Sequence, residues 1–140
     1  MNDNINFRSF KEGDYETCCE WWKWWWKRTG LNPVQRALLP DNERCFIIEK
    51  NGVPIAAYFL LVFEFRLVAF TTYLVSNPEY KDNDRKEAVE LLITTAEEFV
   101  RQSGKSYIFS IGRNASLIET HKKLGYSVDP KPSHEIIKKI

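Results

Sequence analysis

An Asn-Gly pair near the middle of the chain constrains its fold more than any other sequence feature. Asn51-Gly52 follows an apolar, β-branched run at residues 45–49 and precedes a longer apolar stretch at residues 53–76. Two such residues between apolar runs are the strongest short-range signal for a β-hairpin. The second stretch is too long for one strand, so we expect a break near residues 64–66. The sequence therefore predicts three consecutive antiparallel strands at the centre of the fold.

The rest of the chain contains helix-type and strand-type apolar patterns. In chain order they predict a strand at 5–10, a helix at about 15–29 with Asp14 as its N-cap, a short helix through 37–39, a helix through 88–100, a strand at 107–111, a helix through 117–124, and final strands at 126–128 and 134–140. The complete order is β-α-α-β-β-β-α-β-α-β-β. It is typical of an α/β (α+β) fold with a mixed sheet and helices on its faces, and 140 residues suit a single domain, 1–140.

Composition and charge exclude several classes of protein. The chain has 20 Lys and Arg and 19 Asp and Glu, a formal net charge of +1, so nothing favours binding to nucleic acid or to an anionic membrane. The longest mostly apolar run, residues 53–63, is too short to cross a bilayer. Residues 1–4 are polar and lack a secretory pattern, so we expect a cytoplasmic protein. The three cysteines and two histidines have no metal-ligand spacing, so we expect no metal site.

Three local features within this order of elements point to one protein family. They are YLVSNPEY at residues 73–80 at the end of a predicted strand, a helix directly after it, and Asn114 followed eleven residues later by Gly125-Tyr126. Over nearly the whole chain the sequence resembles the GNAT superfamily of acyl-CoA-dependent N-acyltransferases. The resemblance implies a mixed, mostly antiparallel sheet of about six to seven strands with helices on both faces. It also implies direct attack of an amine on a thioester, in a gap between residues 73–76 and 107–111.

The resemblance implies a cofactor and the groups that would hold it. The cofactor is acetyl-CoA or a related acyl-CoA, and the acceptor is a small-molecule or protein amine. Backbone N–H groups of Val75 and Ser76 would bind the pantetheine arm and polarise the thioester carbonyl. Asn114 would lie near that arm at the start of a helix, where an asparagine is equally an ordinary helix cap. Val75 is also expected in the core, and its two roles are compatible.

The loop that binds the pyrophosphate in this family is where the sequence departs from the family pattern. Lys81 fits the first, basic position, but Asp82, Asp84 and Lys86 stand where the family has glycines. Glycines let the N–H groups of the helix start reach the phosphates, and here two carboxylates would face them. Lys81, Arg85 and Lys86 retain positive charge near this position, so they are the candidate phosphate ligands.

Residues 84–87 also form a capping-box pattern. In such a box the side chains of Asp84 and Glu87 satisfy the same helix N–H groups that a phosphate would need. We expect the cap to dominate, with the helix beginning within a residue or two of Asp84. The loop therefore predicts a glycine-less and weakened coenzyme A site.

The departing thiolate needs a proton, and His121 stands where the family often has a tyrosine. A histidine can donate a proton at neutral pH, which makes His121 the candidate catalytic residue. Its position between Leu117 and Leu124 on an apolar helix face equally predicts simple packing. No general base is assigned, because neither Glu49 nor Glu64 has a spacing that nominates it.

All five tryptophans lie within residues 21–26 of the first predicted helix. Helical spacing divides them into three on the apolar stripe (Trp22, Trp25 and Trp26) and two that point elsewhere (Trp21 and Trp24). The family resemblance places the end of this helix beside the acceptor pocket, so Trp24, Lys27 and Arg28 are the candidate substrate-binding residues. The same aromatic side chains could equally form a protein interface, including that of a homodimer.

The sequence leads to two hypotheses of different class. The first is an N-acyltransferase, most simply an N-acetyltransferase, acting on an amine. The alternative is a non-catalytic GNAT-fold binding or assembly module that interacts through its tryptophan-rich first helix. The complete set of family elements favours the first, whereas the glycine-poor loop and the histidine in the acid position favour the second.

Overall fold

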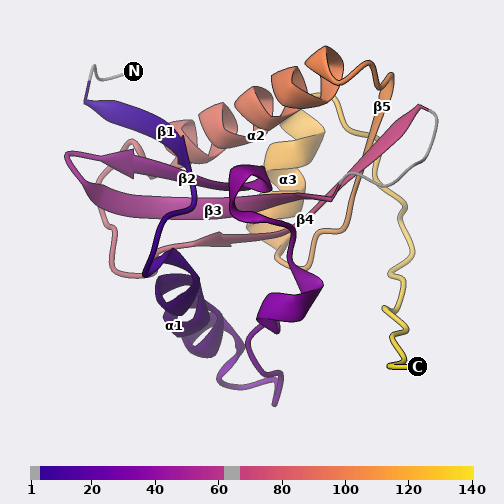
Figure 1. The fold of residues 1–140 in the computed structure, drawn as a ribbon, viewed down its shortest axis with the longest axis horizontal. Coiled ribbons are helices and arrows are strands. Elements are labelled where there is room, and N and C mark those ends of the chain that lie inside the picture. The colour runs from indigo at the N-terminus through magenta and orange to yellow at the C-terminus, as the bar shows by residue number, and fades with distance from the viewer. Residues whose placement is uncertain (1–3, 62–66) are drawn as a thin grey trace.

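The computed structural model describes residues 4–61 and 67–140, which form a five-stranded sheet with helices on both faces (Figure 1). The strands, in sheet order, are β1 (Ile5–Ser9), β2 (Cys45–Lys50), β3 (Val53–Leu61), β4 (Val68–Ser76) and β5 (Tyr107–Ser110). The helices are α1 (Asp14–Trp26), α2 (Arg85–Gln102) and α3 (Ala115–Lys123), and two 3₁₀ turns, η1 (Arg36–Leu38) and η2 (Asn42–Arg44), precede β2. Strands β1 to β4 pair antiparallel, and β5 is parallel to β4. The predicted mixed, mostly antiparallel sheet is confirmed.

The predicted central hairpin is also confirmed. Asn51, with φ of 51°, and Gly52, with φ of 77°, form the turn between β2 and β3. Both lie in the left-handed region that a two-residue hairpin turn requires. β3 and β4 then pair antiparallel, as predicted, while the expected break at residues 64–66 lies outside the described residues.

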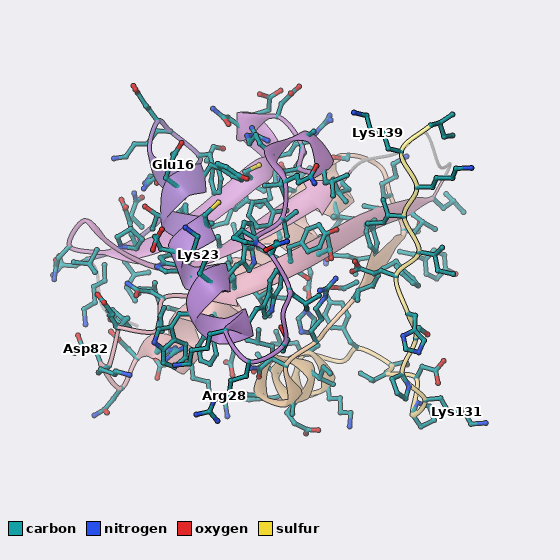
Figure 2. The ribbon with its side chains drawn as sticks, turned by 90° about the horizontal axis from the view of Figure 1, so that it is seen from below. Glu16, Lys23, Arg28, Asp82, Lys131 and Lys139 are labelled. Carbon is teal, nitrogen blue, oxygen red and sulfur yellow. The ribbon has the colours of Figure 1, made fainter. Side chains whose placement is uncertain are left out.

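Both faces of the sheet are buried, which explains why β2 and β3 are apolar almost without interruption. Along β2, Phe46 and Ile48 face the core beneath α2, whereas Cys45 and Ile47 face the core beneath α1. Figure 1 shows α1 and α2 on opposite faces of the sheet, and Figure 2 looks onto the face that α1 covers. Helix α3 packs through its apolar side on the same core as α2.

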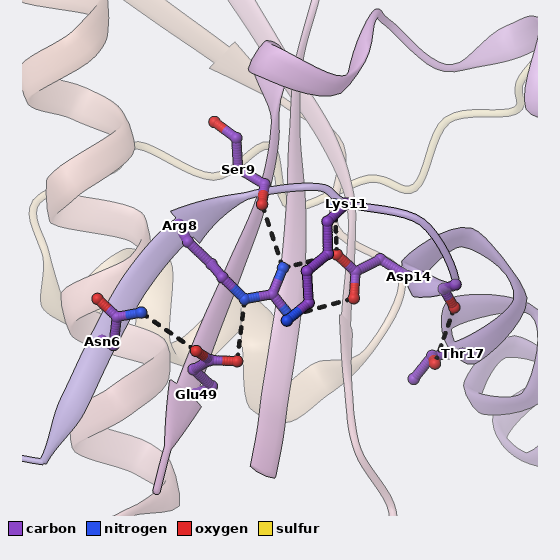
Figure 3. Close-up of polar contacts among 8 residues, drawn as sticks. Asn6, Arg8, Ser9, Lys11, Asp14, Thr17 and Glu49 are labelled. Atoms are coloured by element: carbon purple, nitrogen blue, oxygen red, sulfur yellow. Dashed lines mark hydrogen bonds and ion pairs between the residues drawn. The ribbon is translucent and has the colours of Figure 1, made fainter. Parts of the chain in front are cut away.

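A cluster of charged side chains fixes the start of α1 against the first two strands (Figure 3). Arg8 of β1 donates through Nη1 and Nη2 to the carboxylate of Asp14, at 2.6 and 3.1 Å, and through Nε to Glu49 of β2 at 2.9 Å. Asp14 also accepts the backbone N–H of Lys11 at 2.7 Å. The predicted N-cap is therefore wrong, because these donors hold the Asp14 carboxylate; Gly13 takes the N-cap position, with φ of 92°.

The gap expected beside β4 is present. β4 and β5 pair only as far as Thr71 and Ser110, and β4 then continues to Ser76 with no described strand on that side. A bulge in β4 lies just beyond this point, where Tyr73 has a positive φ of 56° and the pairing with β3 shifts. The two parallel strands therefore separate at their carboxyl ends.

Two local predictions are wrong. The final strands expected at residues 126–128 and 134–140 do not form; this segment runs beyond β5 without joining the sheet (Figures 1 and 2). Pro130 and Pro132 interrupt the segment and cannot donate to a ladder, so the sheet of the described residues has five strands rather than six to seven. The helix expected through 37–39 is only the turn η1, because Pro40 follows it at once.

Candidate active site

A cavity of about 810 Å³ lies at the gap between β4 and β5. Its walls come from the end of α1, the end of β4, the start of α2, the loop after β5 and the inner side of α3. The structure brings six of the predicted site residues into this wall: Val75, Ser76, Arg85, Lys86, Asn114 and His121. They come from separate elements, so the tertiary fold rather than sequence proximity assembles them.

The start of α2 borders the cavity without a side-chain cap. Asp84 takes the N-cap position, close to where the sequence predicts the helix to begin, but its carboxylate makes no hydrogen bond to the helix. It accepts instead from Nζ of Lys50 and from the hydroxyl of Tyr80, each at 2.6 Å. The predicted capping box is therefore wrong, and neither Asp82 nor Asp84 is part of the cavity wall. The N–H of Arg85 donates to the carbonyl of Asp82 at 3.3 Å, and those of Lys86 and Glu87 remain suited to an anion.

Arg85, the first residue of α2, is a half-buried cation in the cavity wall. Its Nη2 donates to Oγ of Ser76 at 2.6 Å, and its guanidinium lies 5.6 Å from the ring centroid of Trp25. Trp25 donates from Nε1 to the carbonyl of Ser76 at 2.8 Å. Burial lowers the pKa of Arg85 below its ordinary value, and no carboxylate in the described part of the chain pairs with it. Such a guanidinium is suited to an anionic ligand.

The cavity as a whole is positively charged and largely apolar. Arg85, Lys86 and Arg113 line it, and none of the described residues in its wall is an aspartate or glutamate. Much of the remaining wall is aliphatic or indole surface. Cations beside an apolar channel suit a ligand with phosphates at one end and an uncharged arm.

The described residues contain no cluster of His, Cys, Asp or Glu that could hold a metal ion. They also contain no helix that is long and apolar enough to span a membrane.

His121 lies in the cavity wall, but both of its ring nitrogens bond within the protein. Nδ1 lies 2.8 Å from the carbonyl of Leu117, which can only accept, so Nδ1 carries a proton. Nε2 lies 3.1 Å from the hydroxyl of Tyr58, which also contacts Thr71 and Ser110 at 2.7 and 3.0 Å. In the neutral ring Nε2 accepts from Tyr58, and no N–H points into the cavity. This geometry favours a packing role for His121 over a role as the acid that protonates the thiolate.

Four predicted site residues are not part of the cavity wall. Lys81 lies in the loop before α2, and Trp24, Lys27 and Arg28 lie on or just after the end of α1. Trp24 is 44% exposed, and Nζ of Lys27 lies 4.2 Å from its ring centroid. Arg28 points outward at the edge of the molecule (Figure 2). The helical phase of Trp24 turns it away from the sheet, so this group does not reach the gap.

Other tryptophans occupy the cavity wall instead. Trp25 and Trp26, expected in the core, are half-buried and line the cavity. Trp21 is the opposite case: it was expected to point away from the core but is only 5% exposed. Its position three residues after the buried Cys18 places it on the buried stripe.

The loop after β5 contributes two neighbouring polar residues to the wall. Asn114 accepts through Oδ1 from the backbone N–H groups of Ser116 and Leu117, at 2.8 and 3.4 Å, so it caps α3, one of the two roles that the sequence left open. Arg113 was not among the predicted site residues. Its position directly before Asn114, at the end of the predicted gap, is the signal that could have identified it.

Solved structures that share this arrangement include two acetyltransferases. An aminoglycoside acetyltransferase from an uncultured soil metagenomic sample matches over 99% of each chain, with a TM-score of 0.68 and 9% identity. A GCN5-related N-acetyltransferase from Ralstonia eutropha matches over 94% of this chain and 98% of its own, with a TM-score of 0.66 and 16% identity.

A third similar structure is N-acetylglutamate synthase from Neisseria gonorrhoeae, in complex with coenzyme A and L-arginine. It matches 94% of this chain with a TM-score of 0.71 and 17% identity, and the chain spans 30% of that longer protein. No protein-family model matches the sequence, and neither does any curated protein. The likeness to the three solved structures shows that the chain has the GNAT fold, as the sequence resemblance implied.

Proposed function

We propose that the chain is an N-acyltransferase, of the N-acetyltransferase kind, that moves an acyl group from acetyl-CoA or a related thioester to an amine. The observation that carries the proposal is the meeting of three features in one cavity: the gap between β4 and β5, the uncapped start of α2, and Arg85 without a described carboxylate partner. Acetyltransferases that share the fold support it, among them the synthase solved with coenzyme A.

The residues at the start of α2 fit a diphosphate without the family's glycines. Glycine is needed where a side chain would block the approach to the helix N–H groups. Here the side chain of Asp84 is held away from the helix start by its two hydrogen bonds, so it does not occupy the N–H groups of Lys86 and Glu87. Arg85 and Lys86 would bind the phosphates from the cavity wall, and Lys81 would add positive charge in the preceding loop.

The end of β4 would hold the acyl group. Beyond Thr71 no described strand pairs with β4 on the β5 side, so main-chain groups on that edge are not used by the sheet. The N–H of Ser76 points to that edge and would polarise the acyl carbonyl. The N–H of Val75 points to β3, as does that of Asn77, which donates to Ile55, and this pairing keeps the strand rigid. A bound thioester supplies the activated acyl group.

The reaction forms a bond between the amine nitrogen and the acyl carbon and breaks the carbon–sulfur bond. The amine loses a proton, and the thiolate gains one to leave as the thiol. Because no described carboxylate lines the cavity, the proton of the amine would pass to water.

Calorimetric titration with acetyl-CoA and with free coenzyme A tests the proposal. We expect micromolar binding, weakened about 10–100-fold by Arg85→Met, because the phosphates then lose a half-buried cation. Arg101→Met is the matched control: this arginine lies at the other end of α2, is exposed, and pairs with Glu98 on the same helix. No binding at millimolar acetyl-CoA would refute the proposal.

His121→Phe separates the two roles of this residue. We expect turnover to fall by less than about tenfold, since both ring nitrogens already have partners in the protein. A loss of about 10²–10⁴ in turnover at unchanged thioester affinity would instead identify His121 as the acid. The release of free thiol measures turnover, and the melting temperature shows whether the variant is folded.

The alternative of a non-catalytic module has little support. It requires an exposed face of tryptophans on α1. Of the five, Trp24 alone is exposed, at 44%, while the others are buried or half-buried against the sheet and the cavity. A single exposed indole is normal for a soluble surface.

A further inference from the structure

Arg113 is a second cationic position in the cavity, on the face of the sheet opposite α2. It follows β5 and lines the cavity together with Trp26 at the end of α1. Its guanidinium lies 5.3 Å from the ring centroid of Trp26 and 5.8 Å from that of Tyr73. Two aromatic rings therefore position the guanidinium, and its N–H edges stay directed at a hydrogen-bond acceptor.

The backbone of β4 holds Tyr73 in this cluster. Tyr73 lies at the bulge with φ of 56°, a conformation that residues with side chains rarely adopt and that often accompanies functional sites. It packs against the core that α1 covers, on the same side as the tryptophans. Burial and the nearby carboxylate of Glu135 raise the pKa of Tyr73, and Arg113 opposes this rise. Arg113, Trp26 and Tyr73 therefore form one cluster beside the cavity.

Arg113 already has a carboxylate partner. Glu135, in the C-terminal segment, forms an ion pair with it, and the two side chains are 27% and 35% exposed. The segment around Glu135 joins no strand, and its neighbour Ile136 is 94% exposed. A pair held by one exposed segment contributes little to stability, so another carboxylate can displace Glu135 at small cost.

The following inference rests on the proposed function. We propose that the acceptor is an amine that also bears a carboxylate on an apolar body, as an amino acid with an apolar side chain does, and that Arg113 binds this carboxylate in place of Glu135. The flat guanidinium edge matches a carboxylate with two parallel hydrogen bonds. Trp26 and Leu31 provide apolar surface against which the body of the acceptor packs.

The charge of the cavity selects against acceptors with several positive charges. A polyamine needs carboxylates in the wall to replace the water around its ammonium groups. The described wall offers none, and it carries Arg85 and Lys86, while the charge of Arg113 is balanced by Glu135 until an acceptor carboxylate takes its place. The site thus combines attraction for a carboxylate with repulsion of a polycation, which together determine specificity.

A matched series of acceptors tests the inference. L-Phenylalanine, L-phenylalaninamide and 2-phenylethylamine share an amine and a phenyl group, and only the first has a carboxylate; L-leucine and L-leucinamide form a second pair. With acetyl-CoA and measurement of the released thiol, kcat/KM should be about 10–100-fold higher for each acid than for its amide, mainly through KM.

Variants of Arg113 and Glu135 test whether Arg113 causes the preference for the acid over the amide. Arg113→Met should reduce the ratio of acid to amide to about 1, because the carboxylate loses its partner. Arg101→Met, the exposed control, should leave the ratio unchanged. Glu135→Gln should lower KM for L-phenylalanine, since it removes the competing carboxylate, without changing KM for the amide.

Two results would overturn the inference. One is that the amides, or spermidine, are better acceptors than the acids. Another is that Arg113→Met weakens acetyl-CoA binding and leaves the ratio unchanged, which would assign Arg113 to the phosphates. If acetyl-CoA does not bind at all, the proposed function fails separately, and calorimetry with L-phenylalanine and its amide alone decides this inference. The inference requires that L-phenylalanine binds, that its amide does not, and that Arg113→Met abolishes the binding of L-phenylalanine.

Discussion

Replacing Arg8 by methionine should destabilise the protein strongly. The variant keeps the length of the side chain but removes the guanidinium that bonds to Asp14 at 2.6 and 3.1 Å and to Glu49 at 2.9 Å. The two carboxylate side chains are only 7% and 13% exposed, so water cannot replace the lost donors in full. Leaving such charges without a cation should cost about 3 kcal/mol, near the lower end of what a broken buried pair costs. Urea unfolding followed by tryptophan fluorescence at pH 7 measures this loss.

The destabilisation should depend on pH. Burial alone would raise the pKa of Asp14 and of Glu49, but the hydrogen bonds and charge of Arg8, with help from neighbouring donors, bring both below their ordinary values of 3.8 and 4.5. A carboxyl group with a lowered pKa stabilises the fold above its unfolded pKa and stops doing so as the pH falls through its folded pKa. In Arg8→Met the donors from Lys11 and Asn6 remain, but the guanidinium is gone, so both pKa values rise relative to those in the native protein. The difference in unfolding free energy between the two proteins should therefore narrow as the pH falls below about 4.

Arg101→Met is the control for removing a surface arginine. Arg101 is 68% exposed and pairs with Glu98, which is 51% exposed, so its loss should change stability by less than about 1 kcal/mol. If Arg8→Met behaves like this control, or if its effect is the same at pH 7 and pH 3, the charged cluster does not anchor α1 as we infer.

Three further predictions concern stability and reactivity. Trp21→Ala should cost about 3–5 kcal/mol in urea unfolding and Trp24→Ala no more than about 1 kcal/mol, because the first side chain is 5% and the second 44% exposed; equal losses would contradict the burial pattern. Native Cys18 and Cys45 should resist a thiol reagent until the protein unfolds, since burial raises the pKa of both thiols, that of Cys45 to about 12; rapid labelling detected by mass spectrometry would oppose this. Gly52→Ala should lower the free energy of unfolding by about 1–2 kcal/mol, because φ at this turn is 77°.

The sequence predicts the centre of the fold well because local signals determine it. Asn51-Gly52 specifies its hairpin through two residues alone, and the apolar face of α2 is a pattern within one helix. The C-terminal strands failed for a different reason. An apolar pattern shows that a segment can be a strand, but pairing also requires a free sheet edge that the chain can reach in register, and residues 126–140 do not use the edge of β5.

Site residues were predictable to the extent that their contacts are local or their positions follow a family pattern. Arg85 and His121 were found in this way, and both lie in the cavity wall. Asp84 was misjudged because a capping box is a local pattern, whereas Lys50, which holds its carboxylate, is 34 residues away in the sequence. The contacts of Arg113 come from α1, β4 and the C-terminal segment, so its place beside Asn114 was its one local signal.

The parallel pairing of β5 has a consequence for the dynamics of the protein. β5 pairs over four residues with β4 alone, and it can reach that strand only after α2 has crossed the sheet. In the free protein its amide hydrogens should therefore exchange with solvent by local opening, sooner than those of β2 and β3. Opening β5 would displace the loop after it, which lines the cavity, so a ligand that binds only the closed form adds RT ln(1 + [L]/Kd) to the cost of that motion. Bound ligand should therefore slow exchange in β5 by the factor 1 + [L]/Kd, the same factor by which it slows exchange through global unfolding.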